Sequence, residues 1–302
     1  MTLKDAYNAA KKELETAGIL EAALDAWYLL EYVVGITRTV YFAEPGKTID
    51  DGQYREYMEL TAKRASRIPL QHLTGEQEFM GLTFQVNENV LIPRQDTEIL
   101  VETALELIQK EGVPVSGKIL RLLDLCTGSG CILISLMHYL RKKGAGSRAG
   151  YSILDVQGVG ADISEQALAT AKKNAAMHQI EASFEQGDLF ETVSGTFGMI
   201  LSNPPYIRTA EIGRLQEEVR LHDPVCALDG KEDGLYFYRR IVEESRQYLK
   251  KGGILIFEIG YDQAEDVTEL MDQAGFSDIR IRKDLAGLDR VVFGRYDNEW
   301  KG

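Results

Sequence analysis

The clearest indication of the fold is the segment Ile119-Leu-Arg-Leu-Leu-Asp-Leu-Cys-Thr-Gly-Ser-Gly130. Residues 119–125 are mostly apolar, as in a strand that is buried on both faces, and a helical pattern begins at Cys131. A strand, a glycine-rich turn and a helix form the opening unit of a doubly wound α/β sheet. The glycines allow a ligand to approach the backbone closely, although a tight turn that requires positive φ would need them too.

A dinucleotide site is the main alternative for this turn, and the sequence argues against it. The fingerprint G-x-G-x-x-G requires a third glycine, but Leu133 stands at that position. The acidic residue expected about 20 residues further on comes late, because Asp162 follows Gly128 by 34 residues (162 − 128). The basic, glycine-rich stretch 141–152 explains the delay as an inserted surface loop.

Polar residues stand at the ends of the strands that follow. Asp162 ends an expected strand over 156–161, Asp188 and Leu189 follow a third strand, and Asn203 follows a fourth. A carboxylate at the end of the second strand is where a ribose is bound in doubly wound folds. Asp188 is either an acceptor for an adenine amino group or a cap for the next turn.

The fourth strand leads directly into the tetrapeptide Asn203-Pro204-Pro205-Tyr206. The two prolines fix φ and have no N–H to donate, so the stretch is stiff and its carbonyl groups are free to face a ligand. Asn203 adds a side-chain acceptor, and Tyr206 adds a flat aromatic face. A proline-rich turn that merely ends a strand has the same composition, so the context must decide between the two interpretations.

The beginning of the chain has helical periodicity and predicts a small all-α domain over residues 1–75. Expected helices there include 22–34, which Gly35 ends, and 52–66. No residues in this domain have catalytic spacing. It is therefore expected to serve in recognition.

The remaining chain predicts a linker and a larger domain. Apolar residues around a turn at Asn87-Glu88-Asn89 predict a linker β-hairpin over 76–93. From residue 94 to 302 strands and helices alternate, which predicts a single α/β domain. Its first helix is expected to be capped by Asp96 or Thr97.

Composition and charge restrict the partners of this 302-residue chain. Its formal net charge is −13, whereas a protein that grips nucleic acid needs a surplus of Lys and Arg. The three cysteines, Cys126, Cys131 and Cys226, have no paired spacing, so neither a disulfide framework nor a zinc site is expected. This cysteine usage predicts a cytoplasmic location. No apolar run approaches the roughly 20 residues of a membrane helix, and Met1 to Leu14 lacks the apolar block of a signal peptide.

The glycine turn, Asp162 and the tetrapeptide at successive strand ends make the second domain resemble class I methyltransferases that use S-adenosylmethionine. The whole chain is similar to one family of that class, the release-factor glutamine N5-methyltransferases, which methylate the glutamine of the Gly-Gly-Gln motif in bacterial peptide chain release factors. The similarity includes Leu91-Ile92-Pro93-Arg94 and the segment from Asp284 to Val291. It implies a doubly wound, mostly parallel sheet with a small helical N-terminal domain joined by a β-hairpin.

The resemblance also implies a role for each candidate residue. The methionine part of the cofactor would lie on Cys126, Thr127, Gly128, Ser129 and Gly130, the ribose on Asp162, and the adenine on Asp188 and Leu189. The substrate glutamine would lie on Asn203, Pro204, Pro205 and Tyr206, with Asn203 also bordering the cofactor. No metal and no dedicated general base are expected. Cys126 stands where the family usually has glycine, and Leu189 replaces an aromatic residue of some members.

Two other functions are compatible with parts of this pattern. DNA or RNA adenine-N6 methyltransferases share the Asn-Pro-Pro-Tyr motif, but they need machinery to bind nucleic acid and to flip a base. A non-catalytic cofactor-binding protein would not need the intact tetrapeptide. We therefore expect a monomeric enzyme that acts on release factors and binds neither nucleic acid nor membranes directly.

Overall fold

The computed structural model describes residues 1–44, 46–142 and 155–297. By their contacts the residues form two compact units. Unit 1 comprises Met1–Glu76 together with Gln216–His222, and unit 2 comprises Gln77–Leu215 and Asp223–Gly302. Most of the loop expected over 141–152 lies outside the described residues.

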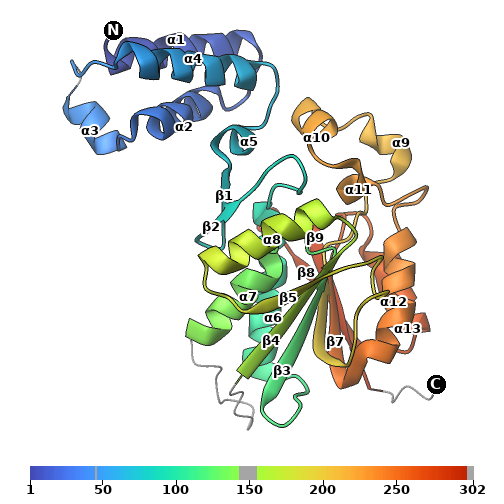
Figure 1. Ribbon diagram of the computed structural model, residues 1–302. Coiled ribbons are helices and arrows are strands. Elements are labelled where there is room, and N and C mark those ends of the chain that lie inside the picture. Colours follow the sequence, from blue (N-terminus) through green and yellow to red (C-terminus); the bar gives the residue numbers. More distant parts are fainter. Residues whose placement is uncertain (45, 143–154, 298–302) are drawn as a thin grey trace. The chain divides into compact units, whose positions relative to one another are not determined.

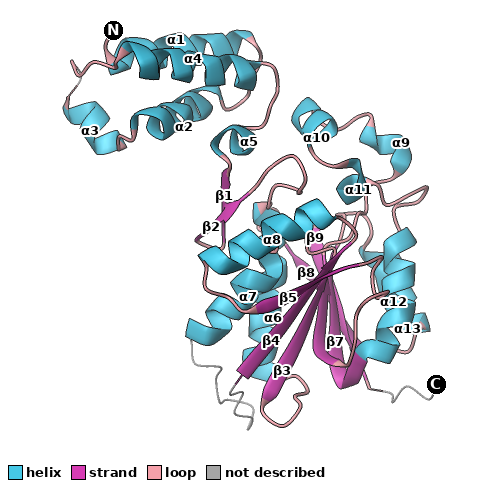
Figure 2. Cartoon of the chain, in the orientation of Figure 1, coloured by secondary structure: helices cyan, strands magenta, loops and turns pink. Residues whose placement is uncertain are grey.

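Unit 2 contains a seven-stranded sheet with the strand order β5-β4-β3-β6-β7-β9-β8 (Figures 1 and 2). The strands are β3 (Ile119–Leu125), β4 (Asp155–Asp162), β5 (Ala182–Gln186), β6 (Phe197–Ser202), β7 (Leu249–Glu258), β8 (Ser277–Lys283) and β9 (Asp289–Tyr296). Strands β3 to β7 are parallel, whereas β9 runs antiparallel to both β7 and β8. The structure thus confirms the predicted doubly wound, mostly parallel sheet.

Helices cover both faces of this sheet and form a core on each side. They are α6 (Gln95–Glu106), continued by the π-helical turn η1 (Leu107–Glu111), α7 (Cys131–Lys142), α8 (Glu165–Met177), α12 (Tyr236–Tyr248) and α13 (Ala264–Gln273). Successive strand residues alternate between the cores: Leu122 packs with α6 and α7, and its neighbour Leu123 packs with α12 and α13. Burial on both faces explains why the strands are nearly continuous apolar runs.

Unit 1 is helical. Its helices are α1 (Leu3–Thr16), α2 (Ala22–Val34), α3 (Arg38–Ala43), α4 (Asp51–Ala65), α5 (Leu70–Thr74) and α10 (Glu217–His222). The predicted helices over 22–34 and 52–66 correspond to α2 and α4, and Gly35 ends α2 in the left-handed conformation with φ +68°. The short helices α3 and α5 were not predicted, because five or six residues are too few to show a period.

The hairpin and the start of α6 differ from the predictions. Strands β1 (Glu76–Phe79) and β2 (Leu82–Gln85) are joined at Met80-Gly81, where φ is +54° and +67°, and not at residues 87–89. The side chain of Glu98 holds this turn by accepting a 2.6 Å hydrogen bond from the Met80 amide. Helix α6 begins earlier than expected, with Arg94 as its N-cap, so neither Asp96 nor Thr97 caps it.

Short helices follow the tetrapeptide. They are α9 (Thr209–Ile212), α10 of unit 1, and α11 (Val225–Leu228). Within the described ranges of the chain, none of the helices has the length and apolar character needed to cross a bilayer.

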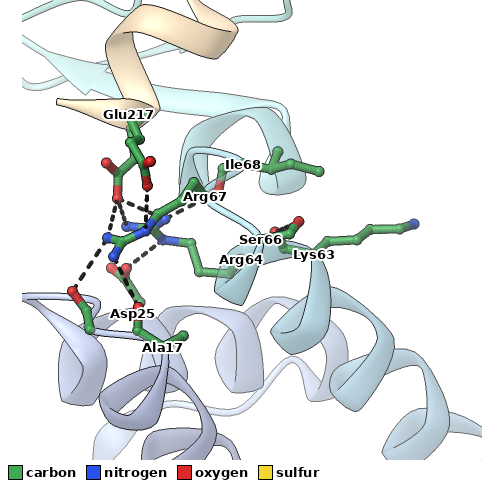
Figure 3. Close-up of polar contacts among 10 residues, drawn as sticks. Ala17, Asp25, Lys63, Arg64, Ser66, Arg67, Ile68 and Glu217 are labelled. Atoms are coloured by element: carbon green, nitrogen blue, oxygen red, sulfur yellow. Dashed lines mark hydrogen bonds and ion pairs between the residues drawn. The ribbon is translucent and has the colours of Figure 1, made fainter. Parts of the chain in front are cut away.

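A buried arginine joins α2, α4 and α10 within unit 1 (Figure 3). The Nε of Arg64 donates to Asp25 at 2.7 Å, and its Nη atoms donate to Glu218 at 3.3 Å. Arg67 pairs with Glu217 and Glu218, both at 3.3 Å. Two arginines of α4 and its C-terminal turn therefore hold α10, although α10 follows the tetrapeptide in the sequence.

We predict that Asp25→Ala lowers the free energy of unfolding of unit 1 by about 2–3 kcal/mol, because Arg64 stays buried with one carboxylate partner fewer. Urea unfolding followed by the fluorescence of buried Trp27, in a Trp300→Phe background, measures it. The control is Glu59→Ala, which removes an exposed pair with Lys63 and should cost less than about 0.5 kcal/mol. Equal effects of the two substitutions would contradict the prediction.

Candidate functional site

A cavity in unit 2 lies at the carboxyl edge of the sheet, where the strand order reverses between β3 and β6. Its volume is about 250 Å³, several times the roughly 30 Å³ that a water molecule occupies in the liquid, so a small organic ligand has room there. Of the predicted site residues, the cavity is lined by Cys126, Thr127, Gly128, Ser129, Asp162, Asp188, Leu189, Asn203 and Pro205. Gly130, Pro204 and Tyr206 are not part of its lining.

The register of the strands brings these residues together. Leu125 at the end of β3 is level with Ala161 of β4 on one side and with Ser202 of β6 on the other. The residue that follows each of these three is a predicted site residue. Parallel pairing therefore places three polar turns at one level of the sheet.

The turn after β3 needs left-handed backbone at three positions. Cys126, Gly128 and Gly130 have φ values of +58°, +54° and +79°. Gly130 also packs tightly, because a Cβ atom there would lie 2.8 Å from Ile134 of α7 and 3.2 Å from Ala171 of α8. Gly130 thus shapes the turn without touching the cavity, and Cys126 adopts a conformation that favours glycine.

Two carboxyl groups lie behind the turn. Asp162 accepts backbone hydrogen bonds from Gly128 and Ser164, both at 2.9 Å, one on each oxygen. Burial raises the pKa of Asp162 even though these hydrogen bonds act in the opposite direction. Asp124 is fully buried and accepts from the Thr127 hydroxyl at 2.6 Å, and burial raises its pKa to about 7. Asp162 keeps lone pairs for a ligand hydroxyl.

Asp188 has a partner that the sequence did not suggest. Arg240 of α12 donates to both of its carboxylate oxygens, at 3.0 and 2.8 Å. A ligand amino group at Asp188 would share the carboxylate with this arginine. The neighbouring Leu189 is buried and forms an apolar part of the cavity wall.

Side chains from three other elements hold the tetrapeptide. The Asn203 amide nitrogen donates to the Thr97 hydroxyl of α6 at 3.4 Å. The Tyr206 hydroxyl donates to Glu258 of β7 at 3.3 Å, and the Tyr206 carbonyl accepts from Gln263 at 3.0 Å. Pro204 and Pro205 are buried. Both ends of the tetrapeptide are therefore fixed by side chains of unit 2.

Three of these supporting residues were not predicted from the sequence. Thr97 was interpreted as a helix cap, and Glu258 and Gln263 were not considered. The sequence contained a signal for Glu258, because it is the only charged residue in the apolar run 254–259. For Gln263 the sequence contained no such signal, because an uncharged polar residue before a helix is common.

Comparisons with known proteins agree with this architecture. Two family models match the chain, the PrmC N-terminal domain over residues 5–75 and a methyltransferase domain over residues 116–286. The release factor glutamine methyltransferase of Agrobacterium fabrum is 38% identical over 286 residues, covering 94% of each chain. That of Caulobacter vibrioides is 38% identical over 297 residues, covering 97% of this chain and 96% of the relative.

This chain belongs to the release factor glutamine methyltransferase family. The family predicted from the sequence is thereby confirmed. A crystal structure of a methyltransferase from Pyrococcus furiosus is similar with a TM-score of 0.50 at 16% identity, covering 78% of this chain and 98% of that one. This likeness supports the fold alone.

The cofactor of the family, S-adenosylmethionine, fits the chemistry of the cavity. The ligand carries positive charge, and the carboxylates of Asp162 and Asp188 border the cavity. Its adenine has apolar faces, and Leu189 and Ile132 line the same space. The assignment of each residue to a part of the cofactor stays a prediction.

The backbone at Cys126 generates a second prediction. Cys126→Val should lower the free energy of unfolding by about 2 kcal/mol, because a β-branched residue is strained at φ +58°. It should also weaken cofactor binding, since the turn lines the cavity. Cys126→Gly should keep the affinity within about threefold, because glycine accepts this conformation freely. Urea unfolding and calorimetric titration with S-adenosylmethionine measure both, and equal behaviour of the two variants would refute the prediction.

Proposed function

We propose that this protein transfers a methyl group from S-adenosylmethionine to the side-chain amide N5 of the glutamine in the Gly-Gly-Gln motif of bacterial peptide chain release factors. The observation that carries the proposal is the placement of Asn203-Pro204-Pro205-Tyr206 at the end of β6, directly beside the cavity with Asp162. Membership of the release factor glutamine methyltransferase family supports the same substrate.

The tetrapeptide suits a planar amide. An amide nitrogen is a weak nucleophile because its lone pair is delocalised into the carbonyl group. In the proposed reaction, the Asn203 side-chain oxygen and the Pro204 carbonyl each accept one N–H of the glutamine amide, which favours positive charge on the nitrogen. Tyr206 stacks on the planar group. When bound, S-adenosylmethionine supplies an electrophilic methyl group.

These residues contribute by placement. Pro204 and Pro205 are buried and have fixed φ angles, so the carbonyl acceptor changes little in position when substrate arrives. The proton of the methylated nitrogen leaves after the transfer, so the proposal includes no dedicated general base.

On the cofactor side, we assign the residues by the parts of the ligand they suit. The turn Cys126-Thr127-Gly128-Ser129-Gly130 holds the methionine part, Asp162 the ribose hydroxyls, and Asp188 with Leu189 the adenine. Asn203 borders both ligands, because it lines the cavity and belongs to the tetrapeptide.

Replacing Asn203 with alanine tests the proposed site. We expect kcat to fall by about 10²–10³-fold, as for the loss of one preorganised hydrogen-bonding group, while the Kd for S-adenosylmethionine stays within about threefold. Transfer of labelled methyl to a purified release factor measures kcat, and a release factor with its Gly-Gly-Gln glutamine replaced is the negative control. Labelling of that control, or of DNA instead, would overturn the proposal.

We also propose that unit 1 docks the release factor. Leu24, Tyr28 and Tyr32 stand four residues apart on α2 and are 36%, 43% and 52% exposed, so they form an apolar stripe on one face of the helix. Tyrosine is favoured at protein interfaces because its ring is apolar and its hydroxyl can remain hydrated. The stripe gives the docking role a defined surface.

The double substitution Tyr28→Ala/Tyr32→Ala should raise KM for the release factor about tenfold, since removing interface anchors typically costs more than about 1 kcal/mol. The values of kcat and cofactor Kd should stay unchanged. Ile281→Ala, which truncates a residue of similar exposure (46%) on β8 of unit 2, is the matched control. An unchanged KM in the tyrosine variant would exclude the stripe as a docking surface.

The remaining partner assignments follow from charge and cysteine chemistry. We propose that the enzyme is a monomer that binds release factors without direct contact to nucleic acid, because its net charge of −13 opposes binding to phosphates. We place it in the cytoplasm, since its three cysteines are unpaired thiols.

A further inference from the structure

A buried carboxyl group lies next to the tetrapeptide without taking part in the proposed chemistry. Glu258, at the end of β7, is 2% exposed. Its Oε1 accepts from the Tyr206 hydroxyl at 3.3 Å, and among the described residues its Oε2 has no hydrogen-bond partner. A buried carboxylate is costly unless it is paired, so stability alone does not account for it.

Within the part of the chain that the structure describes, Glu258 forms no ion pair. Arg290 of β9 instead forms ion pairs with Asp284 at 3.0 Å and with Asp96 at 3.2 Å. Tyr238 of α12 donates to the backbone carbonyl of Glu258 at 2.9 Å and not to its carboxyl group. The carboxyl group therefore faces the hydroxyls around the tetrapeptide.

Thr97 connects Glu258 to the other end of the tetrapeptide. Its hydroxyl accepts the hydrogen bond from the Asn203 amide nitrogen at 3.4 Å, and it also acts to lower the pKa of the Glu258 carboxyl group. A hydroxyl has one hydrogen to donate and two lone pairs to accept. When Thr97 donates to an ionised Glu258, it can only accept from Asn203, and this contact then uses the amide nitrogen and leaves the carbonyl oxygen for the substrate.

We propose that Glu258 is a positioning residue that orients the Thr97 hydroxyl, so that this hydroxyl accepts from the Asn203 amide nitrogen, and that also holds the hydroxyl of Tyr206. The inference rests on the proposed function, because it explains how Asn203 keeps an acceptor directed at the glutamine amide. Glu258 itself does not touch the substrate. It acts through Thr97 and Tyr206.

The protonation of Glu258 gives this arrangement a pH dependence. Burial raises the pKa of Glu258 to about 7, against the opposing effects of Thr97, Arg290 and Tyr206, and the charge of Asp96 raises it further. The titratable groups that face it are Asp96 of α6, Cys131 of α7, Tyr206, Tyr238 of α12 and Arg290 of β9. Above this pKa the carboxylate only accepts, whereas below it the acid donates a proton and competes with the hydroxyls. The value of kcat should therefore rise as pH increases through about 7.

The first test is Glu258→Gln, which keeps the shape but replaces one acceptor oxygen with a donor NH₂ group. At saturating cofactor and release factor we expect kcat to fall about 10- to 100-fold, the range for hydrogen bonds to a charged group. KM and cofactor Kd should stay within about threefold. The rise in kcat near pH 7 that is expected of the wild type should be absent from the variant. Because Asp124 also has a pKa of about 7 and is unchanged in the variant, this loss would assign the pH dependence to Glu258 and not to Asp124.

Thr97 supplies an independent test if Glu258→Gln folds poorly. Thr97→Val removes the hydroxyl and should lower kcat as much as Glu258→Gln, whereas Thr97→Ser should restore most of the activity. The double variant should be no slower than the slower single variant, because both break the same connection. Asp25→Asn, a substitution of another buried carboxyl group in unit 1, controls for loss of stability and should leave kcat per folded molecule unchanged.

The possible failures are distinguishable. A wild-type protein that does not methylate the release factor would overturn the proposed function. A wild-type protein that does, together with a Glu258→Gln or Thr97→Val variant of equal kcat and pH profile, would overturn only the positioning role. Additive effects of the two substitutions would also overturn it, because independent effects exclude a shared connection.

Discussion

Hydrogen bonding between parallel strands is the constraint on which the whole site depends. Because β3 pairs with β4 and with β6 in registers that place Leu125, Ala161 and Ser202 at one level, the turns that follow them converge. A shift of one residue in either pairing would exchange the two faces of a strand and move Asp162 or Asn203 away from the cavity. The two apolar cores prevent this shift, since each strand presents alternate residues to both.

Buried polar groups around the cavity have a cost that these cores offset. Asp124 and Glu258 are almost inaccessible, and burial raises the pKa of each to about 7. Each accepts a hydrogen bond from one hydroxyl group, that of Thr127 or of Tyr206, and neither belongs to an ion pair among the described residues. Such an arrangement fixes the direction of hydrogen bonds more than it adds stability.

The segment after the tetrapeptide shows that sequence order and packing differ. Helix α10 lies between β6 and α12 in the chain, but Arg64 and Arg67 hold its glutamates within unit 1. The chain therefore leaves unit 2 and returns to it between Leu215 and Asp223. A covalent connection of this kind places residues of the helical unit close in sequence to the site, which suits a unit proposed to dock the protein substrate.

The class of the fold and the positions of the main strands and helices could be predicted from the sequence. Long apolar runs and glycines at required left-handed turns depend on local chain properties, so patterns of the residues alone reveal them. Similarity to the family also identified the tetrapeptide. The short helix α3 was not predicted, because six residues are too few to show a period. The Met80-Gly81 turn was not predicted either, because methionine is not a typical turn residue.

The side chains that support the site could not be predicted without the folded structure. Thr97, Glu258 and Gln263 come from α6, β7 and the segment before α13, and they meet the tetrapeptide through pairing and packing across the sheet. Likewise, Arg240 reaches Asp188 from a helix 52 residues away in the chain. Contacts between distant segments depend on register and crossing geometry, and a single sequence contains no local signal for either.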